Sequence, residues 1–130
     1  MVENKEQQKK PSILIVDDDI TITELMKSLV KMDGHEPTIV NDSLQAMEVA
    51  RSVDPDLITL DLMMPGLNGF ELCELLHNDP DLSDTPIIII SAKDDPQSRE
   101  KALAAGAREY MVKPFDIDEF LDRIKFFAST

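Results

Sequence analysis

Five short apolar runs, each followed by a segment with helical spacing of apolar residues, constrain this chain more than any other feature. The runs are rich in β-branched residues and cover residues 13–16, 38–40, 57–60, 87–90 and 110–112. Runs that are apolar on both faces are typical of parallel strands covered by helices on both sides. Because crossovers between parallel strands are right-handed, this alternation predicts a single doubly wound, five-stranded parallel sheet in an α/β domain.

The composition is that of one folded domain with an acidic surface. The chain has 130 residues, of which 42% are hydrophobic, enough for one core but not for two domains. A net charge of -13 disfavours direct binding to nucleic acid or to an anionic membrane, since both need basic patches. The single cysteine, Cys73, is expected in the core and indicates a reducing cytoplasm. Residues 1–11 are interpreted as a flexible N-terminal tail and residues 12–128 as the domain.

The last helix shows which of its side chains should be buried. It is expected to begin near Asp116, with Glu119 three residues later as in a capping box, and to run to about Phe127. Its buried side is predicted from the helical spacing of Ile117, Phe120, Leu121, Ile124 and Phe127. Phe126 points nearly opposite this stripe and is therefore predicted to be exposed.

Polar residues stand at the carboxyl ends of four of the five predicted strands. Asp17-Asp18-Asp19 follows the first strand, Asp61 the third, Ser91 the fourth and Lys113 the fifth. In open parallel sheets, ligands bind beyond these strand ends, at the point where the strand order reverses. The sequence therefore predicts a functional site at this edge of the sheet.

The residue types at this edge fit the transfer of a phosphoryl group. If the first and third strands flank the switch point, Asp17, Asp18 and Asp61 are crowded and repel one another unless a cation neutralises them. Mg²⁺ suits such a set, because it binds one or two carboxylates and shares phosphate oxygens. With Lys113 as a second positive charge and Ser91 as a hydroxyl donor, a carboxylate could attack phosphorus and form an acyl phosphate.

Each residue also has a plainer interpretation when it is taken alone. Asp19 is expected to cap the first helix, whereas Ser91 and Asp61 could be turn residues and Lys113 an ordinary surface lysine. The joint placement of these residues at one edge of the sheet is what favours a site.

Four motifs in this order resemble those of a known family. They are Ile-Leu-Ile-Val-Asp17-Asp18, Leu-Asp61-Leu-Met-Met-Pro65-Gly66-Leu-Asn-Gly69, Ile-Ile-Ser91-Ala92 and Lys113-Pro114-Phe115. Together with their spacing, they resemble the receiver domains of two-component response regulators, of the chemotaxis-regulator type, from about Ser12 to Phe127. The resemblance implies a flavodoxin-like (βα)5 fold with strand order 2-1-3-4-5.

The resemblance also implies a role for each residue of the metal site. Asp17 and Asp18 resemble the acidic pair that binds Mg²⁺, and Asp61 resembles the phosphoacceptor, which also contacts the metal. The backbone carbonyl of Met63 would complete the metal site.

Further roles concern the phosphoryl group and the switch. Ser91 and Lys113 resemble the pair that holds the phosphoryl oxygens. Tyr110 resembles the switch aromatic, which would turn inward when Ser91 moves toward the phosphoryl group. The Lys113–Pro114 bond would be cis, as the family's usually is.

The expected function is that of a signalling switch in the cytoplasm. A sensor histidine kinase or a histidine phosphotransfer protein would donate the phosphoryl group to Asp61. Beyond slow Mg²⁺-dependent self-phosphorylation and self-dephosphorylation, no enzymatic activity is expected. The change of conformation, and any self-association, would involve the face formed by the helix from residue 96, the strand 110–112 and the last helix.

Three other functions remain to be weighed against this one. A phosphohydrolase with an aspartate nucleophile typically needs a second acid two residues later, where this chain has Met63. A dinucleotide-binding domain needs a glycine-rich turn after the first strand, where this chain has Asp18-Asp19-Ile20. A degenerate receiver that serves only for docking would not need the complete acidic set.

Overall fold

The apolar runs form the five strands of one parallel sheet. The computed structural model describes residues 10–128, in which the strands are β1 (Ser12–Val16), β2 (Glu36–Val40), β3 (Leu57–Leu60), β4 (Ile87–Ser91) and β5 (Glu109–Val112). The strand order is β2-β1-β3-β4-β5, and every pair is parallel. The predicted fold class and strand order are therefore confirmed. The predicted tail falls mostly on residues 1–9, which lie outside the described part, so the domain boundaries stay a prediction.

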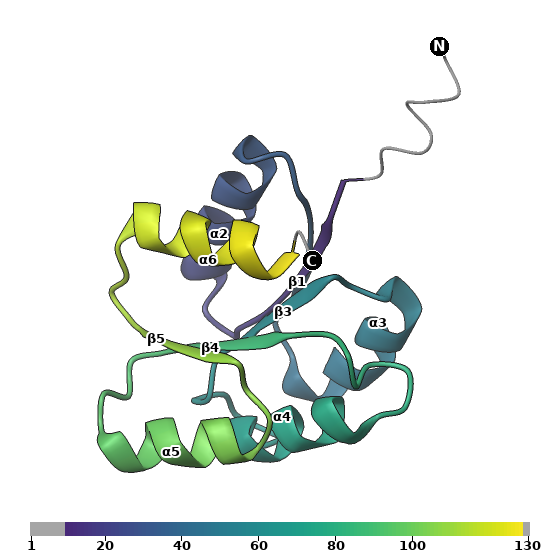
Figure 1. Cartoon of the computed structure of the whole chain (residues 1–130), viewed down its shortest axis with the longest axis vertical. Coiled ribbons are helices and arrows are strands. Elements are labelled where there is room, and N and C mark those ends of the chain that lie inside the picture. The colour runs from purple at the N-terminus through teal and green to yellow at the C-terminus, as the bar shows by residue number, and fades with distance from the viewer. Residues whose placement is uncertain (1–9, 129–130) are drawn as a thin grey trace.

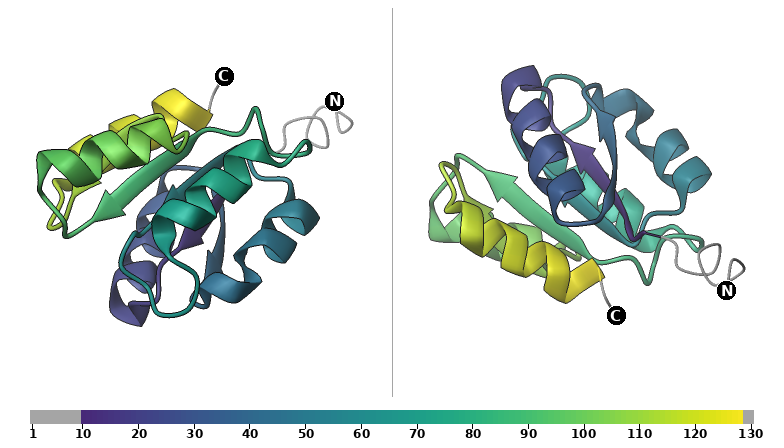
Figure 2. Two further views of the ribbon diagram at one scale, coloured as in Figure 1. Left: turned by 90° about the horizontal axis from the view of Figure 1, so that it is seen from below. Right: turned by 90° about the horizontal axis from the view of Figure 1, so that it is seen from above.

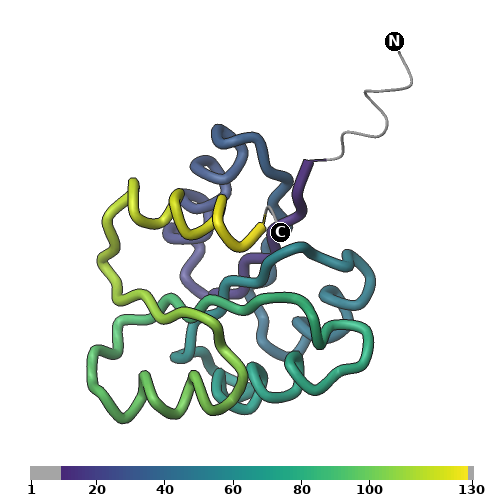
Figure 3. Tube along the Cα trace, in the orientation of Figure 1, coloured from purple at the N-terminus to yellow at the C-terminus, as the bar shows by residue number. Residues whose placement is uncertain are grey.

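Helices cover both faces of the sheet (Figure 1). They are α2 (Ile20–Met32), the short 3-10 helix η1 (Ser43–Gln45), α3 (Ala46–Val53), α4 (Gly69–Asn78), α5 (Pro96–Ala104) and α6 (Ile117–Ala128). Helices α2 and α6 lie on one face, and α3, α4 and α5 lie on the other (Figure 2). The tube in Figure 3 shows how the chain crosses from strand to helix and back at each step. In the part of the chain that the structure describes, no helix is long and apolar enough to cross a membrane.

Each strand contributes side chains to two separate cores, one on each face of the sheet. In β1, Leu14 and Val16 pack toward α3 and α4, whereas Ile13 and Ile15 pack toward α2 and α6. All four are at most 1% exposed. This explains why the strands read as continuous apolar runs instead of alternating with polar residues.

Polar residues fix the ends of the helices as the sequence predicts. The Asp19 side chain accepts the N–H of Ile22 at 3.1 Å and caps α2, and Asp116 accepts the N–H of Glu119 at 3.1 Å before α6. Gly34, just after α2, has a φ of 85°, a conformation that glycine adopts without strain.

The last helix confirms one exposure prediction and corrects another. Phe126 is 65% exposed, as predicted. Ile117 was expected to be buried, and this is wrong, since it is 47% exposed. A helical side chain covers the surface over the turn before it, and Ile117, as the first residue of α6, has no such turn.

Cys73 is a core residue, as expected. It is fully buried in α4, and its Sγ lies 3.8 Å from the carbonyl oxygen of Ala105. Burial, and secondarily the charge of Glu74, raise the pKa of the Cys73 thiol to about 11. The thiol therefore stays protonated at neutral pH, which argues against a nucleophilic role.

A buried hydroxyl in β3 yields a first prediction about stability. Thr59 is 1% exposed, and within residues 10–128 its Oγ1 has no hydrogen-bond partner. Thr59→Val keeps the shape and removes this unsatisfied group, so the free energy of unfolding should rise by about 1 kcal/mol. Urea unfolding followed by circular dichroism measures this change.

A matched control is Thr85→Val, because the Thr85 hydroxyl donates to the carbonyl of Pro55 at 3.5 Å. That variant should not be stabilised. A lower unfolding midpoint for Thr59→Val would show that the Thr59 hydroxyl is satisfied in solution.

Candidate functional site

The sheet itself places the site residues, because its hydrogen bonding continues one residue past the strand ends. The N–H of Asp17 donates to Val40 at 3.1 Å, and the N–H of Asp61 donates to Val16 at 3.0 Å. The N–H of Lys113 likewise donates to Ser91 at 2.9 Å. The backbones of Asp17, Asp61 and Lys113 are therefore each held by a neighbouring strand.

Three carboxylates meet at the edge where β1 and β3 lie side by side. Asp17, Asp18 and Asp61 each offer a carboxylate oxygen, and these oxygens lie within 4.8 Å of one another. Asp17 and Asp61 are 2% and 5% exposed, whereas Asp18 is open to solvent. The sequence prediction that these acids crowd together is borne out by this geometry. Oxygen ligands at this spacing suit a hard divalent cation.

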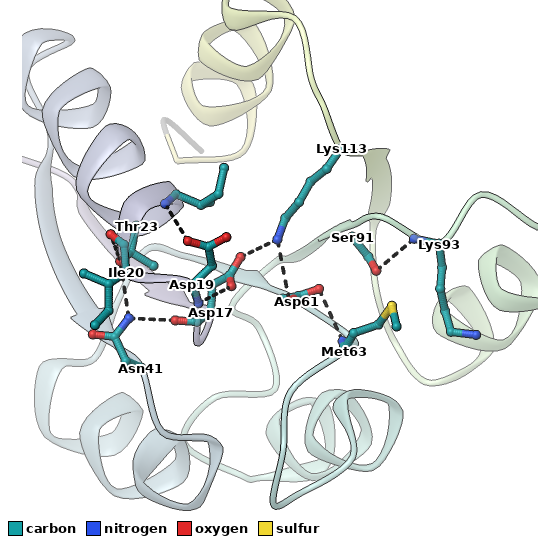
Figure 4. Close-up of polar contacts among 11 residues, drawn as sticks. Asp17, Asp19, Ile20, Thr23, Asn41, Asp61, Met63, Ser91, Lys93 and Lys113 are labelled. Atoms are coloured by element: carbon teal, nitrogen blue, oxygen red, sulfur yellow. Dashed lines mark hydrogen bonds and ion pairs between the residues drawn. The ribbon is translucent and has the colours of Figure 1, made fainter.

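Lys113 neutralises part of the acidic charge. Its Nζ lies 2.6 Å from Oδ2 of Asp17 and 3.6 Å from Oδ2 of Asp61 (Figure 4). Burial by itself lowers the pKa of Lys113, but the hydrogen bond and charge of Asp17, with the charge of Asp61, outweigh burial and raise it. The ammonium group therefore remains charged at neutral pH and bridges the ends of β1, β3 and β5.

Asp61 lies in an environment that disfavours its charge. Burial, and then the neighbouring Asp17 carboxylate, raise its pKa above the ordinary value, although Lys113 and the Met63 amide act in the opposite direction. The N–H of Met63 donates to Oδ1 of Asp61 at 3.3 Å. Asp61 is thus oriented from both sides, by a backbone amide on Oδ1 and by the lysine near Oδ2.

Ser91 lies one strand away from Asp61. Leu60 pairs with Ile89 between β3 and β4, which brings the ends of these strands to the same edge. Ser91 is fully buried, and its Oγ accepts the N–H of Lys93 at 3.3 Å. Figure 4 shows Ser91 on the opposite side of Asp61 from Asp17.

Tyr110, the predicted switch residue, is buried in β5. Its hydroxyl donates to the Lys93 carbonyl at 2.9 Å, and the Arg99 guanidinium lies 4.9 Å above its ring. Burial and then the Asp95 carboxylate raise the pKa of its phenol. The ring already lies inward in this structure, and the predicted inward turn on movement of Ser91 toward the phosphoryl group stays a prediction. The Lys93 carbonyl joins Tyr110 to the same segment whose amide contacts Ser91.

Asn41 supports the site and was missed by the sequence analysis. Its Nδ2 donates to the carbonyl of Asp17 at 2.7 Å and to Oγ1 of Thr23 at 3.3 Å. It thereby ties the loop after β1 to the end of β2 and to α2. A signal was present, since Asn41 directly follows β2, the one strand whose end the sequence analysis left without a polar residue.

Comparisons with known proteins agree with this geometry. A family model described as the response regulator receiver domain matches residues 13–125. DNA-binding response regulator MtrA from Mycobacterium tuberculosis is 36% identical over 113 residues, which are 87% of this chain and 48% of MtrA. The transcriptional regulator RpaA from Synechocystis is also 36% identical, over 88% of this chain and 48% of RpaA. The chain therefore spans about half the length of these curated relatives.

Solved structures show the same fold. A receiver domain of the Francisella response regulator 1452 has a TM-score of 0.85 at 32% identity, covering 92% of this chain and 98% of that one. The chemotaxis protein CheY4 from Vibrio cholerae has a TM-score of 0.85 at 26% identity, covering 91% of this chain and 98% of that one.

The crowded carboxylates lead to a prediction that contrasts two neighbouring residues. Asp18→Asn removes one repelling charge from an exposed position, so the melting temperature in EDTA should rise by a few degrees, a gain of about 1 kcal/mol being worth roughly 4 °C in a domain of this size. Asp17→Asn should lower the melting temperature instead, because it removes the close partner of Lys113. Thermal unfolding followed by circular dichroism measures both. An equal loss of stability in the two variants would contradict repulsion at Asp18.

Proposed function

The chain belongs to the response regulator receiver domain family, and we propose that its Asp61 accepts a phosphoryl group from a phosphohistidine. The donor would be a sensor histidine kinase or a histidine phosphotransfer protein of a two-component system. One observation carries the proposal. The Asp61 carboxylate lies within reach both of two further acids that suit a metal and of the Lys113 ammonium.

The transfer would proceed by in-line displacement. An oxygen of the ionised Asp61 carboxylate attacks phosphorus, the bond between phosphorus and the imidazole nitrogen breaks, and the electron pair leaves with the imidazole. The Met63 amide holds Oδ1 of Asp61 in place during the attack. Lys113 would turn from Asp17 toward the phosphoryl oxygens, which carry more negative charge than the carboxylate that it faces in this structure.

Mg²⁺ fits the acidic cluster, although magnesium binding itself is part of the proposal. The ligand set would be the carboxylates of Asp17, Asp18 and Asp61, and, by analogy with the family, the backbone carbonyl of Met63. When bound, the metal would neutralise charge on the oxygens of the transferring group. The backbones of the buried Asp17 and Asp61 are held by the sheet, which favours a defined coordination geometry.

Phosphorylation would then shift the equilibrium between two packings of the α5, β5 and α6 face. The Ser91 hydroxyl would move to hold a phosphoryl oxygen, and the change would reach Tyr110 through Lys93, which contacts both residues. Self-association of this chain would use the same face, where Phe126 is exposed.

A phosphohydrolase acting on a general substrate is a weaker candidate. Met63, two residues after Asp61, supplies a thioether in place of a second acid, so no carboxylate is present there to activate water. Slow self-phosphorylation and self-dephosphorylation remain part of the proposal.

The curated relatives bind DNA as longer proteins, whereas the charge of -13 argues against direct contact between this chain and DNA. A cytoplasmic location also stays a prediction.

The central test is phosphorylation of the purified chain by acetyl phosphate or by a phosphohistidine donor. The unmodified chain should gain a label that is stable in acid for short periods and is released by hydroxylamine, as an acyl phosphate is. Asp61→Asn should reduce labelling to background, and excess EDTA should do the same to the unmodified chain. Label that persists in Asp61→Asn and resists hydroxylamine would place the modification on another residue.

A further prediction concerns the lifetime of the phosphorylated form. The side chains of Met63 and Lys93 are exposed beside the site and carry no carboxylate or amide that could orient an attacking water. Met63 is also bulky and apolar, so it should exclude water. Self-dephosphorylation should therefore be slower than is usual in this family. The double variant Met63→Asn with Lys93→Glu should accelerate it.

The measurement is the decay of labelled protein after the donor is removed, at constant Mg²⁺. Leu75→Ala, which alters an exposed apolar side chain in α4, outside the face formed by α5, β5 and α6, is a suitable control. Decay of the double variant that is as slow as that of the unmodified chain would show that these two side chains do not protect the phosphoryl group.

A further inference from the structure

Ser43 makes two hydrogen bonds to the loop that joins β3 to α4. This loop follows Asp61 and carries Met63. The Ser43 hydroxyl donates to the carbonyl of Pro65 at 3.0 Å, and its oxygen accepts the N–H of Leu67 at 2.8 Å. Ser43 is 2% exposed and begins η1, at the end of a different strand. A single hydroxyl therefore uses both its donor and an acceptor lone pair to hold one loop.

The loop packs closely at this point. Gly66 lies between the two residues that Ser43 binds, and its φ of 90° is one that residues with side chains rarely adopt. A Cβ at Gly66 would lie 2.8 Å from Oγ of Ser43. At the far end of the loop, a Cβ at Gly69 would lie 2.4 Å from Cα of Leu62. Each glycine thus lets backbone approach a neighbour closely, and Ser43 fixes the middle of the loop.

The fixed middle limits how far the Met63 peptide can move. Before Met63, Asp61 is bound to the sheet through its N–H, and its carboxylate accepts the Met63 N–H. After Met63, the side chain of Met64 is buried at 8% exposure, and Pro65 is held by Ser43. The hydrogen bond between Met63 and Asp61 lies within the loop itself. The two hydrogen bonds of Ser43, in contrast, connect the loop to another part of the chain.

We propose that Ser43 is a positioning residue for the metal site, because its hydroxyl holds the loop that presents the Met63 carbonyl to Mg²⁺. The inference rests on the proposed function, in which that carbonyl is a ligand. Removing the hydroxyl would leave the Pro65 carbonyl and the Leu67 amide without this partner and would let the loop drift. The three carboxylates would be untouched, so Mg²⁺ should still bind, but more weakly.

A purely structural role for Ser43 predicts a different result. If the hydroxyl contributes only to folding, its loss lowers the free energy of unfolding and leaves the Mg²⁺ affinity of the folded chain unchanged. The two roles are therefore separated by measuring metal affinity in chains that are fully folded, and not by measuring stability alone.

The experiment titrates Mg²⁺ into isotope-labelled chains and follows the backbone amide shifts by nuclear magnetic resonance. Ser43→Ala should weaken Mg²⁺ binding by about tenfold, in the range found when groups that orient metal ligands are removed. Ser43→Thr, which keeps a hydroxyl, should restore most of the affinity. Thr85→Val, which removes a hydroxyl bound to the Pro55 carbonyl, is the matched control and should bind Mg²⁺ as the unmodified chain does.

The kinetics of phosphorylation by acetyl phosphate give an independent result. In Ser43→Ala, the Mg²⁺ concentration needed for half-maximal rate should rise with the dissociation constant, while the rate at saturating Mg²⁺ should stay close to that of the unmodified chain. If Ser43→Ala does not fold, Ser43→Cys, whose thiol is a weaker donor and acceptor, should show a smaller loss of affinity in the same direction.

Equal Mg²⁺ affinity in the folded Ser43 variants and the unmodified chain would overturn the inference while leaving the proposed function intact. An unmodified chain that neither binds Mg²⁺ nor is labelled at Asp61 would overturn both. The two failures are thus distinguished by the unmodified chain alone.

Discussion

The ion pair between Lys113 and the two buried aspartates is the interaction on which the rest of this structure depends. Asp17 and Asp61 stand at the ends of adjacent strands, and one carboxylate oxygen from each and one from Asp18 lie within 4.8 Å of one another. Carboxylates at this spacing repel one another, and burial strengthens the repulsion because water no longer screens it. The Lys113 ammonium, 2.6 Å from Asp17, compensates for part of this cost. It comes from the last strand, so the charges balance only after the whole sheet has formed.

The sheet explains how the Lys113 ammonium comes to lie directly beside the carboxylates whose charge it compensates. Strands β1, β3, β4 and β5 end at one edge, and the ladder continues into the first residue after β1, β3 and β5. Their side chains therefore meet with backbone positions already fixed, and no loop has to be ordered to bring them together. The loops contribute in a different way. They orient the residues at the strand ends through hydrogen bonds, as the Met63 amide does for Asp61 and the Asn41 amide does for the Asp17 carbonyl.

This division also explains what the sequence could and could not predict. The strands, their parallel order and the acids, lysine and serine at their ends followed from apolar runs and from motifs, since both are properties of contiguous residues. The role of Ser43 did not, because it lies in hydrogen bonds to residues 22 and 24 positions away. The place of Asn41 at a strand end was a signal, but its hydrogen bond to Asp17, 24 positions away, was not. The exposure of Ile117 was misjudged because helical spacing puts it on the buried side, whereas the first residue of a helix has no preceding turn for its side chain to cover. The inward position of Tyr110 depends on packing against Lys93 and Arg99, which no local pattern reveals.

The charge balance at Lys113 suggests how the site couples metal binding to phosphorylation. In this structure the ammonium is closer to Asp17 than to Asp61, so it pairs with a carboxylate that would also be a ligand in the proposed Mg²⁺ site. A divalent cation bound to Asp17 would weaken that contact and free Lys113 to face Asp61. A phosphoryl group on Asp61 would then attract the lysine further, since it carries more negative charge than the carboxylate. Metal and phosphoryl group would thus each favour the same displacement of one side chain, and each would strengthen the binding of the other by linkage.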